Sequence, residues 1–373
     1  MLSPLSQRDY LSDEVLALEQ VRLFRRLWVF AALKQLLVEP NAFATRTIGG
    51  IPIVLQNCAG VIKAFSNQCL HRQMPLQWGA YGKRPLLCRY HGWTYDGEGT
   101  PKNIPGKDEL YCYPSQEMAD LRLRQFAVEC IGNLVFINLG DRPMPIQEQF
   151  SETFLSKLTA ISGSFDAEVI HTRISANYNW KLNFENVLDG NHVRYLHPRT
   201  FMPYMNHSSA KTEEANAQEI RGSTPSATDG QLQDLSYEST TGFKLAPRPW
   251  HQNVARFGTD DIYYNFFIYP NVNFISLGGY VFLIQQFNPL APGKTEIGFS
   301  LMTAKKVRRI PASAAILWAH MQGEKEVLNE DMRALETLQA SLHIEGRPAS
   351  HGAYERQLLM NHAIYRQLMQ TKP

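Results

Sequence analysis

The chain of 373 residues lacks several features that would place it in a common class. It has no run of the roughly twenty apolar residues that a membrane-spanning helix needs. Its polar start, with acids at Asp13 and Glu14, predicts no signal peptide. A net charge of only +2 gives no reason to expect a nucleic acid or an anionic membrane as a partner. No G-x-G-x-x-G motif follows a predicted strand, so no nicotinamide or flavin site is expected. Because neither a signal peptide nor a membrane span is expected, the chain is predicted to be cytoplasmic.

Cysteine is also scarce, with five in the chain. Cys58, Cys112 and Cys130 have no spacing typical of a disulfide framework, which fits free thiols in a reducing compartment. The other two cysteines stand just before histidines, in Cys69-Leu70-His71 and Cys88-Arg89-Tyr90-His91, with 16 residues between the two motifs. The sequence therefore offers one cysteine and one histidine from each of two loops.

This pattern is the ligand set of a Rieske [2Fe–2S] cluster, in which two thiolates bind one iron and two imidazoles bind the other. A tetrahedral zinc site uses the same atoms and is the alternative. The following Gly92-Trp93-Thr94-Tyr95 favours the cluster. Rieske proteins of the respiratory complexes carry two further cysteines that form a disulfide. Met74 and Tyr90 stand at the matching positions here, so no such disulfide is expected.

The run Cys88-Arg89-Tyr90-His91-Gly92-Trp93-Thr94-Tyr95-Asp96 resembles the second cluster loop of Rieske non-haem iron oxygenases, the α-subunit family of the aromatic-ring-hydroxylating dioxygenases. The resemblance implies that Cys69, His71, Cys88 and His91 hold the cluster. It also implies dioxygen as co-substrate, a mononuclear Fe(II), and a separate reductase, with or without a ferredoxin. Because the chain has no nicotinamide motif, NAD(P)H would act only through that reductase.

A second metal site is predicted in the segment 183–197. On a helix, Glu185, Asp189 and His192 would share one stripe, whereas His197 would lie about 140° round from His192. The helix must therefore end or distort between the two histidines, as Pro198 also indicates. Two imidazoles and a distant carboxylate form the facial triad of non-haem Fe(II) oxygenases.

The family resemblance extends to the acidic run 328–336 and implies Asp331 as the carboxylate ligand, with Glu330 and Glu336 as alternatives. It further implies that Asp189 hydrogen-bonds to His192 and meets a cluster histidine of a neighbouring subunit, His91 or, less favoured, His71. The alternative for Asp189 is an ordinary acid on a helix surface. A link between subunits implies a ring, most often a homotrimer. An accompanying β-subunit stays open, although the chain length favours α-subunits alone.

The predicted fold class is α+β in three parts. Residues 1–40 are expected to form a helical segment, with a helix near 13–37, packing on the catalytic domain. Residues 41–142, with short β-rich runs between turns, are expected to form a small all-β Rieske domain. Residues 143–373 form the expected mononuclear iron domain, for which the resemblance implies a helix-grip (START-like) fold with an antiparallel sheet and a long C-terminal helix.

Within the last part, we predict helices at 150–159, 180–196 and 312–342 and another from about 354, with strands at 169–175, 262–268, 272–277, 280–287 and 295–302. The polar segment 206–235 is expected to be a long mobile loop, either a solvated insertion or a lid. The chain shows no internal repeat.

The resulting hypothesis is a terminal oxygenase that hydroxylates an aromatic, preferentially carboxylated substrate, because 185–193 is similar to benzoate- and anthranilate-type hydroxylases. The alternatives are an oxidative N- or O-demethylase, including one for quaternary ammonium substrates, and a Rieske electron carrier or redox sensor without oxygenase activity. Residues that could line an apolar pocket, or else be simple core, are Phe201, Met202, Tyr204, Met205, Phe266, Phe274 and Phe282. Trp250, Tyr263 and Tyr264 are candidates for a cation cage.

Overall fold

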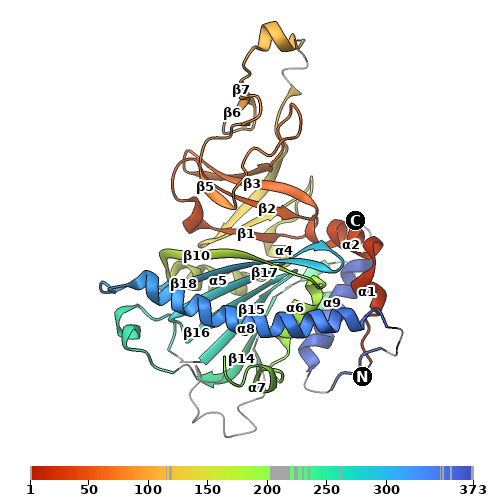
Figure 1. The fold of residues 1–373 in the computed structure, drawn as a ribbon, viewed down its shortest axis with the longest axis vertical. Helices are drawn as coiled ribbons and strands as arrows, with labels where there is room; N and C mark the ends of the chain where they lie inside the picture. The colour runs from red at the N-terminus through yellow and green to blue at the C-terminus, as the bar shows by residue number, and fades with distance from the viewer. Residues whose placement is uncertain are drawn as a thin grey trace. The chain divides into compact units, whose positions relative to one another are not determined.

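The computed structural model describes residues 2–114, 116, 120–201, 219–221, 226–228, 231–233, 236–244, 246–259, 262–344, 346, 348–352 and 355–370. The chain divides into two compact units, Phe24–Met144 and Met1–Leu23 together with Pro145–Pro373. Figure 1 colours the chain from red at the N-terminus to blue at the C-terminus. No helix among the described residues is long and apolar enough to cross a membrane.

The smaller unit is all-β, as predicted. Its seven-stranded antiparallel sheet has the order β1-β9-β8-β4-β3-β2-β5, and a two-stranded sheet joins β6 to β7. The strands are β1 Val29–Leu33, β2 Ala42–Ile48, β3 Ile51–Cys58, β4 Val61–Ser66, β5 Tyr81–Lys83, β6 Thr94–Tyr95, β7 Pro101–Asn103, β8 Gln125–Ile131 and β9 Leu134–Asn138. Short helical turns lie at Lys34–Leu37 and Lys107–Tyr111.

The predicted helix over 13–37 is wrong in its second half. Helices α1 Gln7–Leu11 and α2 Asp13–Glu19 are followed by one π-helical turn, Gln20–Phe24, and then by strand β1. Strand β1 pairs with β9, and all five of its residues are buried. A short, wholly apolar run has no periodicity that separates a buried strand from a helix. The boundary between the units consequently falls at Phe24 and not at the expected residue 41.

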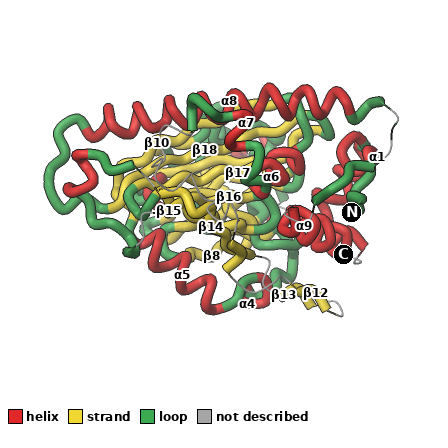
Figure 2. Tube along the Cα trace, turned by 90° about the horizontal axis from the view of Figure 1, so that it is seen from below, coloured by secondary structure: helices red, strands yellow, loops and turns green. Residues whose placement is uncertain are grey.

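The larger unit contains a seven-stranded antiparallel sheet of order β10-β18-β17-β16-β15-β14-β11, and a small β12-β13 pair. Figure 2 shows α8 along one side of these strands and α5 on the other. The strands are β10 Phe165–Ala176, β11 Glu219–Arg221, β12 Ser226–Thr228, β13 Gln231–Gln233, β14 Ser236–Lys244, β15 Ile262–Ile268, β16 Val272–Leu277, β17 Val281–Ala291 and β18 Lys294–Ala304. The helices are α4 Ile146–Gln149, α5 Glu152–Gly163, α6 Trp180–Leu188, α7 Val193–Leu196, α8 Ser313–Ser341 and α9 Arg356–Gln370, with a 3-10 turn at Pro249–Asn253.

This arrangement confirms the predicted antiparallel sheet and long C-terminal helix. The predicted strands 262–268 and 272–277 match β15 and β16 at both ends, and α8 lies within one residue of the predicted 312–342. Most of the predicted loop 206–235 lies outside the described residues; its described part contributes β11, β12 and β13.

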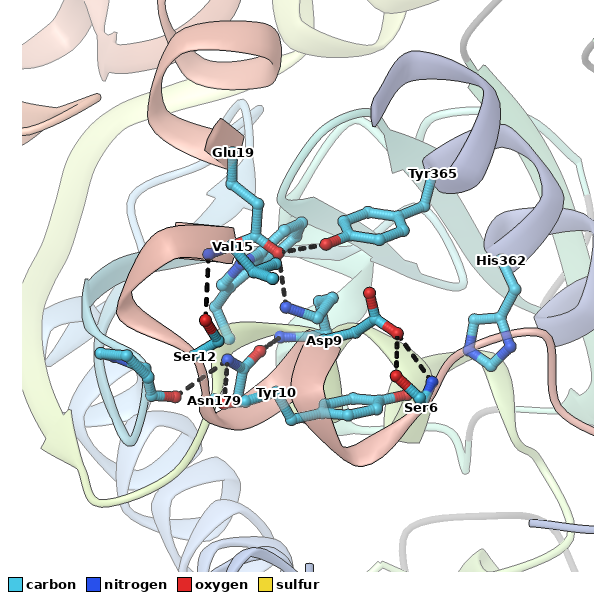
Figure 3. Close-up of polar contacts among 12 residues, drawn as sticks. Ser6, Asp9, Tyr10, Ser12, Val15, Glu19, Asn179, His362 and Tyr365 are labelled. Carbon is cyan, nitrogen blue, oxygen red and sulfur yellow. Dashed lines mark hydrogen bonds and ion pairs between the residues drawn. The ribbon is translucent and has the colours of Figure 1, made fainter. Parts of the chain in front are cut away.

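A buried ion pair ties three helices of this unit together (Figure 3). The Glu19 carboxylate lies 2.5 Å from Lys181 Nζ and accepts hydrogen bonds from Trp180 Nε1 at 2.9 Å and from the Tyr365 hydroxyl at 2.6 Å. The Glu19 and Lys181 side chains are only 1% and 5% exposed. Because these groups come from α2, α6 and α9, the network fixes both ends of the chain to the helix that leads into the predicted iron motif.

Replacing Lys181 with methionine is expected to destabilise the protein by about 3–5 kcal/mol, because it leaves the Glu19 charge buried without its partner. Urea unfolding of wild type and variant measures this difference. Arg8→Met, in the exposed pair with Glu14, is the matched control and should change the free energy of unfolding little. A loss for Lys181→Met no larger than that of the control would mean that the buried pair does not hold the helices together.

Candidate active site

The predicted iron motif is carried by two short helices and not by the single helix predicted over 180–196. Asn179 caps the start of helix α6, and its side chain accepts a hydrogen bond from the Lys181 N–H at 3.0 Å. It ends at Asp189, which has extended backbone angles (φ −100°, ψ 105°) and accepts the Asn191 N–H on Oδ1 at 2.8 Å. An aspartate that bonds its own following backbone competes with helix continuation. The break therefore precedes His192, earlier than expected.

His192, His197 and Asp331 come together although Asp331 lies on α8, far along the chain. One donor atom from each residue lies within 4.8 Å of the other two. Asp331 Oδ1 is 2.9 Å from His197 Nε2 and 3.6 Å from His192 Nε2. Ligand atoms that each bind one ion at about 2.0–2.2 Å must lie about 3–4 Å apart, so these side chains fit a shared ion. The donor set is that of a two-histidine, one-carboxylate iron site.

Glu330 holds His197 from the opposite side of its ring. Its Oε2 lies 2.7 Å from His197 Nδ1 and accepts a hydrogen bond from the Thr200 hydroxyl at 2.5 Å. A carboxylate beside Nδ1 favours the tautomer that carries its proton on Nδ1 and leaves the Nε2 lone pair free for a metal ion. Metal-binding histidines are usually supported in this way. Burial raises the pKa of the Glu330 carboxyl, but its contacts with Thr200 and His197 outweigh this and lower it overall.

Glu336, the other alternative to Asp331 as the carboxylate ligand, contacts Asn177 and not the two histidines. Glu336 accepts hydrogen bonds from the backbone N–H and the side-chain amide of Asn177, at 3.4 and 3.1 Å. Glu185, expected on one stripe with Asp189 and His192, also faces away from the three grouped residues. Its Oε1 accepts from the Tyr10 hydroxyl at 2.7 Å and lies 3.0 Å from His362 Nε2.

Asp189 faces His192 without bonding to it. Its Oδ2 lies 3.6 Å from His192 Nδ1, which is buried and has no hydrogen-bond partner among the described residues. Burial raises the pKa of Asp189, but His192 and the Asn191 N–H outweigh it and lower the pKa overall. Asp189 and Asn186 line both the cavity beside the grouped residues and a larger cavity of about 680 Å³ walled by both ends of the chain.

The cavity beside His192, His197 and Asp331 has a volume of about 80 Å³ and is bounded by the α6–α7 segment, α8 and strands β15 to β17. Side chains alternate between the two faces of a strand. Tyr263 and Asn265 share one face of β15, and the register sets Asn265 opposite Ile275 and Asn273 opposite Gln285. This face of the sheet forms the cavity wall. No lysine or arginine is found among the described residues that line it.

The phenylalanines proposed for a pocket belong to the opposite face of the sheet. Phe266 stacks on Phe274 with ring centroids 5.2 Å apart, and Phe274 lies 6.2 Å from Phe282. All three are buried, and none lines the cavity. They are core, which was the alternative interpretation. Phe201 does line the cavity, 5.7 Å from the Tyr263 ring.

The other pocket candidates give no aromatic cage within the described part of the chain. Met202, Tyr204 and Met205 lie outside the described residues. Tyr263 lines the cavity, whereas Tyr264 is the next residue on the strand and points to the other face. Trp250 packs on His251 and His320, with ring centroids 4.5 and 5.7 Å away.

Sequence reasoning missed the polar part of the cavity wall. Glu324 lies on α8 two helical turns before Asp331 and so on the same side of the helix. Burial raises the pKa of Glu324 to about 7. Burial, together with the charges of Glu324 and Asp331, raises the pKa of Tyr263 well above its usual value, so its hydroxyl stays protonated. Amides inside otherwise apolar strands, at Asn265 and Asn273, were the signal that could have revealed this wall.

The two cluster loops are tight turns of similar design. In the first, the Cys69 N–H donates to Met74 O at 2.9 Å, and the Gln73 N–H donates to Cys69 O at 2.8 Å. In the second, the Cys88 N–H donates to Trp93 O at 2.8 Å, and the Gly92 N–H donates to Cys88 O at 2.9 Å. Gly92 has φ +76°, which a residue without a side chain adopts at little cost. Each loop thus presents its cysteine and histidine together.

The cluster residues fit the predicted group. His71 Nδ1 lies 3.1 Å from His91 Nδ1, close to the separation of about 3 Å expected of two nitrogens on one metal ion. Cys69 and Cys88 are both buried and form no disulfide. Cys69 Sγ lies 3.1 Å from the Tyr95 hydroxyl, and hydrogen bonds to cluster sulfurs tune the cluster potential. Trp93 stacks on His71 with centroids 5.4 Å apart and fixes that ring.

Comparison with known families supports both halves of this description. A family model described as the ring hydroxylating alpha subunit (catalytic domain) matches residues 165–371, and one for the Rieske [2Fe–2S] domain matches residues 28–114. The chain belongs to the Rieske non-haem iron oxygenase α-subunit family. This family comprises mono- and dioxygenases that carry a Rieske [2Fe–2S] cluster and a mononuclear iron.

Individual relatives differ in the substrates that their names state. The chain is 29% identical over 198 residues to the anthranilate 1,2-dioxygenase large subunit of Acinetobacter baylyi, covering 51% of this chain and 42% of that protein. It is 30% identical over 200 residues to the glycine betaine monooxygenase oxygenase subunit of Chromohalobacter salexigens, covering 52% and 43%. The matches thus span less than half the length of these relatives.

Two solved structures share the whole fold. A quaternary ammonium Rieske monooxygenase superposes with a TM-score of 0.78 at 18% identity, covering 99% of this chain and 96% of that one. Naphthalene 1,2-dioxygenase from Rhodococcus sp. gives 0.73 at 17% identity, covering 99% and 95%. These likenesses concern the fold alone, so the substrate must be argued from the cavity.

Proposed function

We propose that the chain is the terminal oxygenase component of a system in which a separate reductase, directly or through a ferredoxin, supplies electrons from NAD(P)H. The observation that carries this proposal is the convergence of His192, His197 and Asp331 beside a cavity. The mononuclear iron that these residues would hold supplies dioxygen activation, and the cluster held by Cys69, His71, Cys88 and His91 supplies electrons singly.

The chain's own residues position the reacting partners. Glu330 fixes the His197 ring, while Asp189 stands beside His192. The protonated Tyr263 hydroxyl and the Phe201 ring lie on the cavity side, where they can orient a ring-bearing substrate. The sheet and α8 enclose the substrate and limit access of bulk water.

For the substrate we propose hydroxylation of an aromatic compound, with oxidative N- or O-demethylation as the second candidate. The Phe201–Tyr263 pair supports an aromatic ring. A carboxylate on that ring would have no lysine or arginine to meet among the described lining residues, and it would face Glu324. The cavity therefore favours a substrate that is neutral or cationic. This departs from the carboxylated substrate expected from the sequence.

The assembly that we propose is a homotrimer, in which Asp189 of one subunit meets a cluster histidine of its neighbour. The larger cavity, with Asp189 in its lining, gives that carboxylate a second open side, as such a contact requires. The alternative of an electron carrier or redox sensor without oxygenase activity is less favoured. Such a protein does not need three grouped iron ligands beside a cavity.

The deciding experiment is the iron and acid-labile sulfide content of anaerobically purified protein, with its EPR spectrum after reduction. We expect about three irons to two sulfides per chain and a Rieske signal. About two irons to two sulfides, unchanged after Fe(II) is supplied, would instead favour the electron carrier.

A further inference from the structure

The cavity wall contains hydrogen-bond acceptors that nothing in the described structure satisfies. Asn265 and Asn273 are 3% and 1% exposed, and the Oδ1 atom of each is buried without a hydrogen-bond partner among the described residues. The Asn273 amide is fixed because its Nδ2 donates to Gln285 Oε1 at 3.2 Å. A buried acceptor without a donor costs about 1–3 kcal/mol. Two such atoms in one cavity wall indicate a ligand that brings donors.

Glu324 adds a third acceptor to the same cavity, on the helix that faces the sheet. The other titratable side chains of the lining are Tyr263 on β15, Asp331 on α8, Asp189 and the two histidines grouped with Asp331, and no lysine or arginine is found among the described lining residues. No hydrogen bond or ion pair is found for its carboxyl within the described part of the chain. We call Asn265, Asn273 and Glu324 the acceptor wall.

We propose that the acceptor wall binds a protonated primary or secondary amine on the substrate. Such a group carries two or three N–H donors and a positive charge, which match two amide oxygens and a carboxyl group. A carboxylate brings acceptors to acceptors and is repelled by the ionised form of Glu324. A quaternary ammonium group brings the charge but no N–H, so the two asparagine oxygens would remain unsatisfied. This inference rests on the proposed function only in treating the cavity as the substrate site.

The spacing along α8 sets the distance between the amine and the oxidised position. Glu324 precedes Asp331 by seven residues, which is about 10 Å along a helix axis. An amine at the acceptor wall is therefore separated from the proposed iron site by the length of a ring or short chain. Phe201 and Tyr263 lie in the same cavity and can contact that spacer. Burial raises the pKa of the free Glu324 carboxyl to about 7, and a bound cation would favour the ionised form.

Four ligands that share a phenyl ring and differ in their polar group test the proposal: benzylammonium, benzyltrimethylammonium, benzyl alcohol and benzoate. Their affinities for the cluster- and iron-loaded protein are measured by isothermal titration calorimetry at pH 7.0. We expect benzylammonium to bind at least about tenfold more tightly than each of the others, the difference typical of a charge-assisted hydrogen bond. This comparison needs no variant, so it does not depend on the folding of a mutant.

Glu324→Gln should weaken benzylammonium binding about tenfold or more and leave benzyl alcohol within about threefold. Glu326→Gln is the matched control, because it makes the same change on an exposed position of the same helix and should alter neither affinity. Benzoate or benzyltrimethylammonium binding as tightly as benzylammonium, no binding of benzylammonium, or an unaffected Glu324→Gln protein would each overturn the amine site.

The iron and sulfide content of the same preparation separates this inference from the proposed function. A protein that lacks the third iron yet binds benzylammonium through Glu324 would keep the amine site and lose the oxygenase assignment. A fully loaded protein that consumes dioxygen with a reductase but shows no amine preference would keep the oxygenase assignment and lose the amine site.

Discussion

His192→Ala is expected to release the mononuclear iron and to lower substrate oxidation by more than about a hundredfold, with the visible spectrum of the cluster intact. His192 provides one of the three donor atoms that lie within 4.8 Å of one another. Losing even an outer partner of a metal ligand typically costs tenfold to a hundredfold, and losing the ligand itself costs more. Iron and sulfide analysis with oxygen-uptake rates measures both effects.

His343→Ala, at an exposed position beyond α8, is the matched control and should change neither quantity. If the His192→Ala protein also lost its cluster, the two metal sites could not be independent. If it kept the full iron content, His192 would not be a ligand.

Asp189→Asn is expected to leave both metal sites filled but to reduce turnover by about a hundredfold. The side chain keeps its shape but loses its negative charge, which faces His192 Nδ1 at 3.6 Å. In the proposed trimer the same carboxylate meets a cluster histidine of the neighbouring subunit. Stopped-flow reoxidation of the reduced cluster in the presence of substrate and dioxygen is the direct measurement. A purely structural role would change stability and leave this rate unaltered.

The control for Asp189→Asn is Asp141→Asn, at a side chain that is 90% exposed. Equal turnover in wild type and the Asp189→Asn protein would remove Asp189 from the proposed link between the two sites. Loss of iron from the variant would show that Asp189 supports the ligand set instead.

Features that depend on a few neighbouring residues could be predicted from the sequence, as the cluster loops illustrate. The Cys69–His71 and Cys88–His91 pairs are local, and their turns close within a few residues. Long elements with clear signals were also predicted well, such as α8. The helix break at Asp189 was misplaced because one side-chain hydrogen bond to Asn191 decides it.

The cavity could not be predicted because it depends on which face of each strand looks inward. Strands β15 and β16 are rich in apolar residues on both faces. The usual alternation of polar and apolar residues therefore does not show whether Asn265 or its neighbour Phe266 faces the cavity. The register between strands and the position of α8 decide the matter, and both are long-range properties. The sequence therefore suggested Phe266, Phe274 and Phe282 as pocket residues, and it did not indicate that Asn265 and Asn273 form the wall.

The two cavities that meet at Asp189 give the ends of the chain an influence on its electrostatics. Tyr10 near the start and His362 near the end both contact Glu185, one turn of α6 before Asp189, and both help to wall the larger cavity. Loosening either end would widen the larger cavity and raise the local dielectric constant around the Asp189 carboxylate. The attraction between that carboxylate and any positively charged group nearby would weaken in proportion. Tyr10 and His362, remote in sequence from every metal ligand, thus share a cavity wall with Asp189 and can influence the field that it exerts.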